Sequence, residues 1–245
     1  MLLLPLSWAL APAAADTNDK DKTKKKPKPG VVAVFEMRGA ILETPAAEDP
    51  FNAGQGESLK DLVSRLEAAR DDERVKAIAV MLGGASMGSA QLEELHDTFK
   101  AIRDHHKPVY FYGDNLSFAG FALASAGSQI SVAPVGDVMI LGLYGEQLYL
   151  RGLLEKLHIR PDYATCGAYK SAAELFMREG PSKEAEEMQN WIFDSLFATY
   201  VDKIAAGRDV SSDKVKGWID EGIYTASEAA AAGIIDKVEV HADFA

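Results

Sequence analysis

From Val31 onward, the sequence alternates between short apolar runs and longer amphipathic segments. The apolar runs have the length and composition of β-strands, and they cover residues 31–37, 75–82, 108–113 and 129–134. The run 75–82 is almost continuously apolar, which is typical of a strand that is buried on both faces of a sheet. Apolar residues at helical spacing predict helices over residues 58–70 and 89–103. This order favours an α/β layer fold with mainly parallel strands and right-handed crossovers.

The second half of the chain is predicted to become increasingly helical. Shorter elements are expected at residues 117–127 (helix), 139–142 (strand), 148–157 (helix) and 161–166 (strand). After Pro181 a long helix carries an apolar stripe, which is usually core or oligomer interface; it consists of Met188, Trp191, Ile192, Leu196, Tyr200 and Ile204. Near the end, Thr225 and Glu228 form a capping box that opens a short alanine-rich helix, which Gly233 stops.

The composition excludes several classes of function. The net charge of −11 argues against nucleic acid as a partner. The single cysteine, Cys166, excludes an internal disulfide and a cysteine-based metal site. The five histidines lack the spacing of metal ligands, so we expect no metal and no cofactor.

The N-terminus differs from the rest of the chain. Residues 1–15 are apolar and end in Ala13-Ala14-Ala15, which resembles a secretory signal or a truncated membrane anchor. Its apolar core is too short to span a bilayer, which takes about 20 residues. Residues 16–30 contain six lysines and three aspartates, which predicts a disordered linker that either rests near anionic lipid or is simply solvated. The globular domain is therefore predicted to be exported and to cover residues 31–245.

A candidate catalytic residue lies in the segment Gly167–Gly180, which reads GAYKSAAELFMREG. Lys170 stands among Tyr169, Ala172 and other apolar residues, where desolvation can lower the pKa of a lysine towards neutrality. A lysine of that kind can act as a general base, although a solvated lysine at the start of a helix is the simpler interpretation. In parallel sheets the chemistry gathers in turns beyond the strand ends, and three such turns are predicted at 83–88, 114–118 and 167–170.

Several motifs together resemble the signal peptide peptidase A family, also called protease IV. They are Gly-Ala-Tyr-Lys-Ser-Ala-Ala-Glu with Arg178 and the following Pro-Ser-Lys-Glu-Ala, Lys107–Tyr110, Ala124–Ala126, and the closing Ile223–Ala226 and Ala232–Asp236. The resemblance covers roughly residues 31–240. It implies a ClpP/crotonase-like fold, a repeated ββα superhelix with a helical C-terminal part. It also implies a serine peptidase with a Ser–Lys dyad, in which Lys170 is the general base.

The resemblance also points to what this chain lacks. The oxyanion hole of the family falls on residues 83–88, where Gly84 or Gly88 could donate, but the Ser-Pro-Gly-Gly pattern of short members is absent. The position of the nucleophilic serine falls on Phe118. Ser117 is one residue away, which is about 100° around a helix, and it is better suited to be a helix N-cap. A lysine without its serine is the pattern of the N-terminal half of the long tandem form, so the chain alone is expected to be inactive.

The resemblance implies that a second domain or a homologous chain supplies the serine. Its expected substrates are cleaved signal peptides and other short apolar peptides, on the periplasmic or extracytoplasmic side of the inner membrane. The apolar stripe and the incomplete site suggest a homo-oligomer near the membrane surface. The alternatives are a catalytically silent assembly or peptide-binding module, and an acyl-CoA enzyme of the crotonase fold, which the exported character argues against. Fold alone does not separate these functions.

Overall fold

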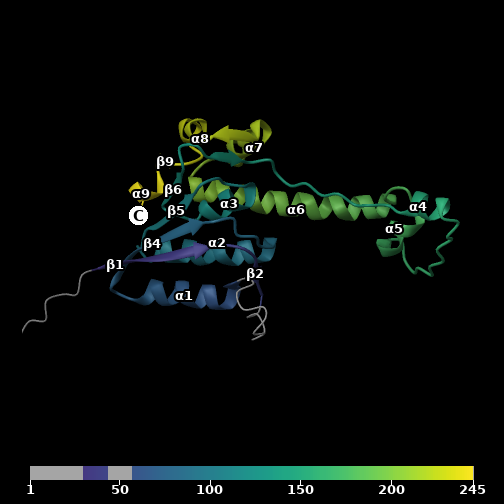
Figure 1. Cartoon of the computed structure of the whole chain (residues 1–245), viewed down its shortest axis with the longest axis horizontal. Helices are drawn as coiled ribbons and strands as arrows, with labels where there is room; N and C mark the ends of the chain where they lie inside the picture. Colours follow the sequence, from purple (N-terminus) through teal and green to yellow (C-terminus); the bar gives the residue numbers. More distant parts are fainter. Residues whose placement is uncertain (1–29, 44–56, 245) are drawn as a thin grey trace, which may run out of the picture.

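The computed structural model describes residues 30–43 and 57–244, and the predicted signal or anchor (1–15) and nearly all of the predicted linker (16–30) lie outside this part. Its first half alternates strands and helices along the chain (Figure 1). These elements are β1 (Val31–Met37), β2 (Ile41–Leu42), β3 (Glu57–Ser58), α1 (Leu59–Asp71), β4 (Val75–Leu82), α2 (Ser89–Asp104), β5 (Val109–Gly113), α3 (Phe118–Ala124), β6 (Gln129–Val132) and β7 (Asp137–Met139).

The second half is mainly helical, as predicted. Its elements are α4 (Arg151–Lys156), the 3₁₀ turn η1 (Ser171–Ala173), α5 (Glu174–Met177), α6 (Lys183–Arg208), α7 (Ser212–Glu221), β8 (Ile223–Thr225), α8 (Ala226–Ala232), β9 (Lys237–Val238) and α9 (His241–Phe244). The capping box at Thr225 and Glu228 is formed, and Gly233 ends α8 in the left-handed conformation with φ +78°. None of the helices in the described ranges is long and apolar enough to cross a membrane.

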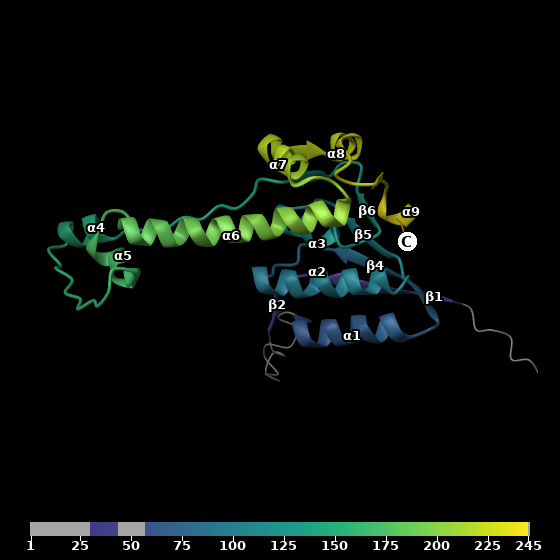
Figure 2. The ribbon, with the colours of Figure 1, turned by 180° about the vertical axis from the view of Figure 1, so that it is seen from behind.

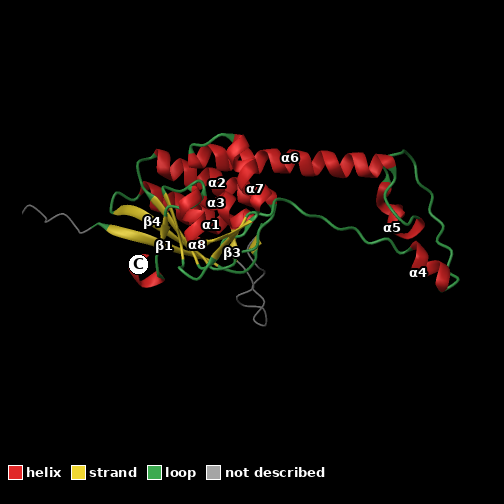
Figure 3. Ribbon diagram, turned by 90° about the horizontal axis from the view of Figure 1, so that it is seen from above, coloured by secondary structure: helices red, strands yellow, loops and turns green. Residues whose placement is uncertain are grey.

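A parallel five-stranded sheet with the order β1-β4-β5-β6-β9 forms the centre of the molecule. The predicted α/β class with a parallel sheet is therefore confirmed. Helices α1, α2 and α3 cover one face of the sheet (Figure 3). The core between them is built on aromatic and aliphatic side chains, and the rings of Phe99 on α2 and Phe111 on β5 pack edge to face with centroids 5.0 Å apart.

The opposite face of the sheet is largely open, which corrects the prediction that the strand at 75–82 is buried on both sides. Val75, Ile78 and Val80 are buried, whereas Ala77 and Ala79 are only partly covered. These alanines line a hollow of about 600 Å³ on the open face, to which α9 also contributes. The burial pattern of β4 thus alternates, as in a strand with helices on one side only.

The long helix α6 joins the core to a projecting arm (Figures 1 and 2), which we define as residues 144–195. The C-terminal half of α6 is packed in the core, where Tyr200, Val201 and Ile204 are buried. Its N-terminal half extends away from the sheet and carries α4, η1 and α5 at its far end. Two predictions about this region were wrong. Residues 161–166 do not form a strand, and the strand expected at 139–142 is β7, which ends at Met139 and pairs antiparallel with β8.

Candidate functional site

Lys170 is the N-cap of η1, which leads directly into α5, and α5 lies near the far end of the arm (Figure 1). Gly167 adopts φ +94°, a left-handed conformation that favours glycine, and its carbonyl accepts a hydrogen bond from the Lys170 N–H at 3.2 Å. The lysine borders an open hollow of about 420 Å³, together with Tyr163, Cys166 and Ala173. The sequence from Gly167 therefore builds a tight turn that presents Lys170 beside a concave surface.

The Lys170 side chain is exposed in this chain, as are its neighbours Tyr169 and Ala172. Ala173 is the buried member of the turn. The apolar surroundings that the sequence predicts for the ammonium group are therefore not assembled by the described residues on their own. A second surface that covers the turn would be needed to remove water from Lys170.

Two polar contacts tie the Lys170 turn to the beginning of α6. The carboxylate of Glu174 accepts a hydrogen bond from the backbone N–H of Ser182 at 2.9 Å. Hydrogen bonding from Ser182 holds the pKa of Glu174 below its usual range, and the nearby Arg178 adds to this effect. On the other side of Lys170, the hydroxyl of Tyr169 donates to the carboxylate of Glu187 at 3.3 Å.

The candidate oxyanion glycines lie on the core, in the turn after β4. Gly84 is exposed and has φ +80°. The N–H of Gly88 donates to the side-chain carbonyl of Gln91 at 2.8 Å, while the Gln91 amide donates to the carbonyl of Ile41 at 3.0 Å. An oxyanion at Gly88 would therefore have to displace Gln91. The assignment of Gly84 or Gly88 to an oxyanion hole stays a prediction.

The turn after β5 contains the position where the resemblance places the nucleophile. Phe118 is 7% exposed, and its ring packs against the ring of Tyr200 on α6. The hydroxyl of Ser117 accepts a hydrogen bond from the N–H of Gly120 at 3.2 Å, so Ser117 is the N-cap of α3. The side chains at this position thus serve the packing and capping of α3.

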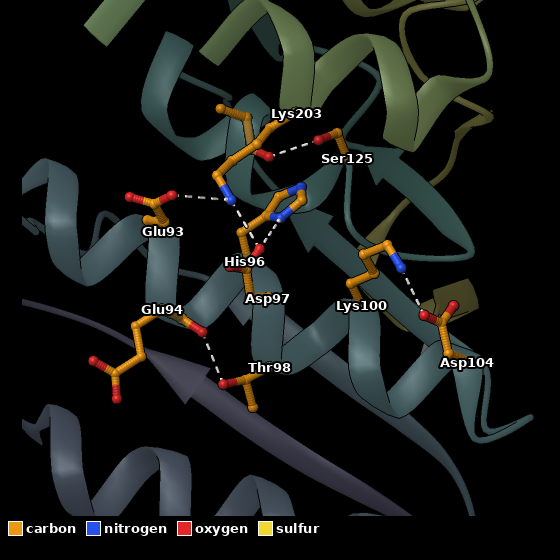
Figure 4. A network of polar contacts seen from close by, with 10 residues as sticks. Glu93, Glu94, His96, Asp97, Thr98, Lys100, Asp104, Ser125 and Lys203 are labelled. Atoms are coloured by element: carbon orange, nitrogen blue, oxygen red, sulfur yellow. Dashed lines mark hydrogen bonds and ion pairs between the residues drawn. The ribbon is translucent and has the colours of Figure 1, made fainter. Parts of the chain in front are cut away.

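A polar network fixes α6 to α2 where α6 enters the core (Figure 4). The ammonium group of Lys203 lies 2.8 Å from the carboxylate of Asp97 and 3.7 Å from that of Glu93. Burial raises the pKa of Asp97, but hydrogen bonds from Lys203 and His96 outweigh this effect and lower it overall. His96 is 4% exposed, and burial lowers its pKa despite the neighbouring Asp97.

The three predicted turns do not meet at one edge of the sheet. The turns after β4 and β5 belong to the core, whereas the turn of Lys170 lies on the arm and does not follow a strand. Sequence reasoning also missed the contacts of Glu174 and Lys203, although Glu174 belongs to the motif around Lys170. Within residues 30–43 and 57–244, no three His, Cys, Asp or Glu side chains are grouped as metal ligands would be.

Fold and site together define an α/β protein with a parallel sheet and a lysine-bearing arm. The sequence profile of Peptidase family S49 matches residues 101–245. Protease 4 of Haemophilus influenzae is 33% identical over 162 residues, which are 64% of this chain and 26% of that protein. The chloroplastic serine protease SPPA of Arabidopsis thaliana is 24% identical over 209 residues, which are 85% of this chain and 30% of that protein.

Among solved structures, a mutant of the membrane-bound stomatin-specific protease 1510-N superposes with a TM-score of 0.49 and 15% sequence identity. The match covers 88% of this chain and 83% of that one. The chain belongs to the serine peptidase family S49, because the family profile covers more than half of its length. The matched region spans 26% of Protease 4 of Haemophilus influenzae and 30% of the chloroplastic protease SPPA.

Proposed function

We propose that this chain supplies the general-base lysine, Lys170, of a Ser–Lys peptidase site that is completed by a serine from a second domain or another chain. Membership in family S49 supports peptide hydrolysis. One observation supports the proposal that the two catalytic residues come from different domains or chains. Phe118 is buried at the position where the family resemblance places the nucleophile, while the lysine lies on the arm. A neutral lysine can take the proton of a serine hydroxyl without the help of a histidine.

The surface of the arm supports a partner. Large apolar side chains are exposed there, including Tyr144 at 85% and Trp191 at 71%. Others along the arm are Leu148, Leu153, Leu157, Ile159 and Tyr169. Exposed apolar surface of this extent usually marks an interface. A subunit packed on the arm would bury these residues and remove water from Lys170, which makes a homo-oligomer or a serine-bearing neighbour part of the proposal.

The substrates that we propose are short apolar peptides, including cleaved signal peptides, at the extracytoplasmic side of a membrane. The apolar surface near Lys170 suits such peptides, and the apolar residues 1–15 support export or anchoring of the chain. The family relatives are proteases by name, and one of them is a putative signal peptide peptidase SppA from Enterococcus faecium.

A second candidate function is that of a silent assembly or peptide-binding module of the same fold. Two observations favour it. Phe118 is fixed by packing, and the N–H of Gly88 is already bonded to Gln91. In such a module Lys170 would be exposed but would have no catalytic role.

A fluorophosphonate probe separates the two functions, because it reacts only with an activated serine. The purified chain alone should not be labelled, whereas the assembly of this chain with the serine-bearing domain or chain should carry the label on a serine outside this chain. Replacing Lys170 by Ala in that assembly should abolish labelling, while Lys156→Ala on the same arm should not. Labelling of Ser117 in the isolated chain would contradict the proposal, and a fully assembled protein without any labelled serine would favour the silent module.

A further inference from the structure

Helix α6 and the segment 140–150, which has no regular secondary structure, connect the arm that carries Lys170 to the core (Figure 1). Lys170 is followed by one turn of 3₁₀ helix, η1, and then by Glu174 at the beginning of α5. Helix α6 contains 26 residues and is therefore about 39 Å long. Its C-terminal half is held in the core by the burial of Tyr200 and Ile204 and by the ion pair between Lys203 and Asp97. Whatever fixes the Lys170 turn to α6 therefore also sets the position of Lys170 relative to the core.

Glu174 makes the shorter of the two polar contacts that tie the turn to α6. Its carboxylate lies at the N-terminus of α6, where unpaired backbone N–H groups and the helix dipole favour a negative charge. The hydroxyl of Ser182 accepts from the N–H of Ala185 at 3.1 Å, so Ser182 is the N-cap and its own N–H is left for Glu174. The contact is partly buried, in contrast to the exposed contact between Tyr169 and Glu187.

A ring stack and a backbone hydrogen bond close the same loop around Lys170. The rings of Tyr163 and Phe176 stack with centroids 5.8 Å apart and planes 11° apart, and these residues lie on either side of Lys170 in the sequence. The N–H of Leu150 donates to the carbonyl of Leu175 at 2.7 Å, which joins the residue before α4 to α5. The stack and this bond hold the loop together, but neither of them reaches α6. Of the contacts described here, the bond of Glu174 is the partly buried one that joins the loop to the N-terminus of α6.

We infer that Glu174 is a positioning residue, which holds the Lys170 turn on the N-terminus of α6 and thereby aims the Lys170 ammonium group at the serine of the completed site. This inference rests on the proposed role of Lys170. In this role Glu174 acts through Lys170, so its loss should change the rate of the chemical step and not substrate binding. The acceptor oxygen is what the contact requires, and an amide oxygen can replace it.

The test uses the complete assembly and three variants of its lysine-bearing chain. Glu174→Ala removes the acceptor, Glu174→Gln keeps it without the charge, and Glu179→Ala removes an exposed carboxylate from the same arm. With a quenched apolar peptide as substrate, Glu174→Ala should lower kcat about 10- to 100-fold with little change in KM, because a displacement of the base by about 1 Å has an effect of this size. Glu174→Gln should restore most of kcat, and Glu179→Ala should leave it unchanged.

A second measurement follows the turn without relying on activity. Trypsin cleaves after Lys170 when the turn opens, and losing the acceptor oxygen should raise the cleavage rate about tenfold in Glu174→Ala but not in Glu174→Gln. Loosening of the turn together with a loss of kcat that Gln rescues supports the inference. Wild-type kcat in Glu174→Ala, a loss that Gln does not rescue, or unchanged cleavage after Lys170 overturns it.

Lys170→Ala, measured in the same assay, separates this inference from the proposed function. If Lys170→Ala is inactive while Glu174→Ala is fully active, only the positioning role of Glu174 is wrong. If Lys170→Ala keeps its activity, the proposed function itself is wrong.

Discussion

The ring of Phe118 packs edge to face against the ring of Tyr200, with centroids 5.4 Å apart and planes at 84°. This pair joins the beginning of α3 to the core half of α6, at the position where the family resemblance places a nucleophilic serine. The hydroxyl of Tyr200 also donates to the hydroxyl of Ser89 at 3.1 Å, so that Tyr200 links α2 and α6. An aromatic side chain at position 118 therefore stabilises the root of the arm that carries Lys170.

Replacing Phe118 by Ala should lower the free energy of unfolding by about 3 kcal/mol or more, because it removes a buried ring and leaves a cavity. Tyr200→Phe keeps the ring pair and loses only the hydroxyl contact, so it should cost about 1 kcal/mol. Urea denaturation followed by circular dichroism measures both changes. A loss below about 1 kcal/mol for Phe118→Ala would show that this pair does not hold the helices together.

The close approach of α6 and α3 gives a second prediction. A Cβ atom at Gly207 would overlap the backbone carbonyl of Ser125, so Gly207→Ala should force the two helices apart and cost at least about 2 kcal/mol. Gly217 lies inside α7 with nothing within 4 Å of an added Cβ, so Gly217→Ala should stabilise the protein by about 0.5 to 1 kcal/mol. Thermal unfolding of the two variants should shift in opposite directions. Equal shifts would contradict the packing described for α6.

The stability of the chain should fall in mild acid because of His96. Its pKa is lowered by burial, and its buried Nε2 atom has no hydrogen-bond partner among the described residues, while Asp97, Lys203 and Arg103 act on it electrostatically. A histidine with a lowered pKa stabilises the fold above the pKa of the unfolded chain, which is about 6.5. This contribution is lost as the pH falls below that value, because the unfolded chain then binds a proton that the folded chain resists.

The free energy of unfolding from urea titrations between pH 7.5 and pH 5 measures this effect. His96→Asn should be less stable at pH 7.5, yet its stability should depend less on pH than that of the wild type. An identical slope in both proteins would show that another group causes the acid sensitivity.

The exposed apolar surface of the arm predicts self-association or binding to a related domain. Trp191→Glu places a charge in this surface and should shift the protein towards smaller species in sedimentation velocity experiments. Val135 is 99% exposed but lies on the core between β6 and β7, so Val135→Glu should leave the sedimentation coefficient unchanged. A wild-type chain that stays monomeric, alone and with its serine-bearing partner, would contradict the interface.

The sequence was sufficient to predict the core but not the arm. The apolar runs predicted as strands correspond to β1, β4, β5 and β6, and the apolar positions of α1, among them Leu59, Leu62 and Leu66, are buried as their helical spacing suggests. The segment at 161–166 looks like a strand because it contains Tyr163 and Thr165, but no strand of the described part of the chain pairs with it. An apolar run such as 75–82 does not reveal whether one face or both faces of the strand are buried, because burial depends on elements that are distant in sequence.

Only part of the candidate site could be predicted from the sequence. The motif around Lys170 predicts a catalytic lysine, which stays a prediction, and Gly167 adopts the left-handed conformation that a glycine in a tight turn allows. The distance of this turn from the core follows from the length of α6 and the loop that accompanies it, which no local pattern reveals. The bond between Glu174 and Ser182 crosses a turn of irregular backbone, so it could only be found from coordinates.

The central claim, that Lys170 is the general base of a composite peptidase site, is tested most directly by peptide cleavage in the complete assembly. The account predicts that Lys170→Ala lowers kcat by at least about 10³-fold and leaves the size of the assembly unchanged, since removal of one member of a catalytic set has effects of this order. Lys156→Ala, at the end of α4 on the same arm, should cleave the peptide at the wild-type rate. Wild-type cleavage by Lys170→Ala would contradict the account.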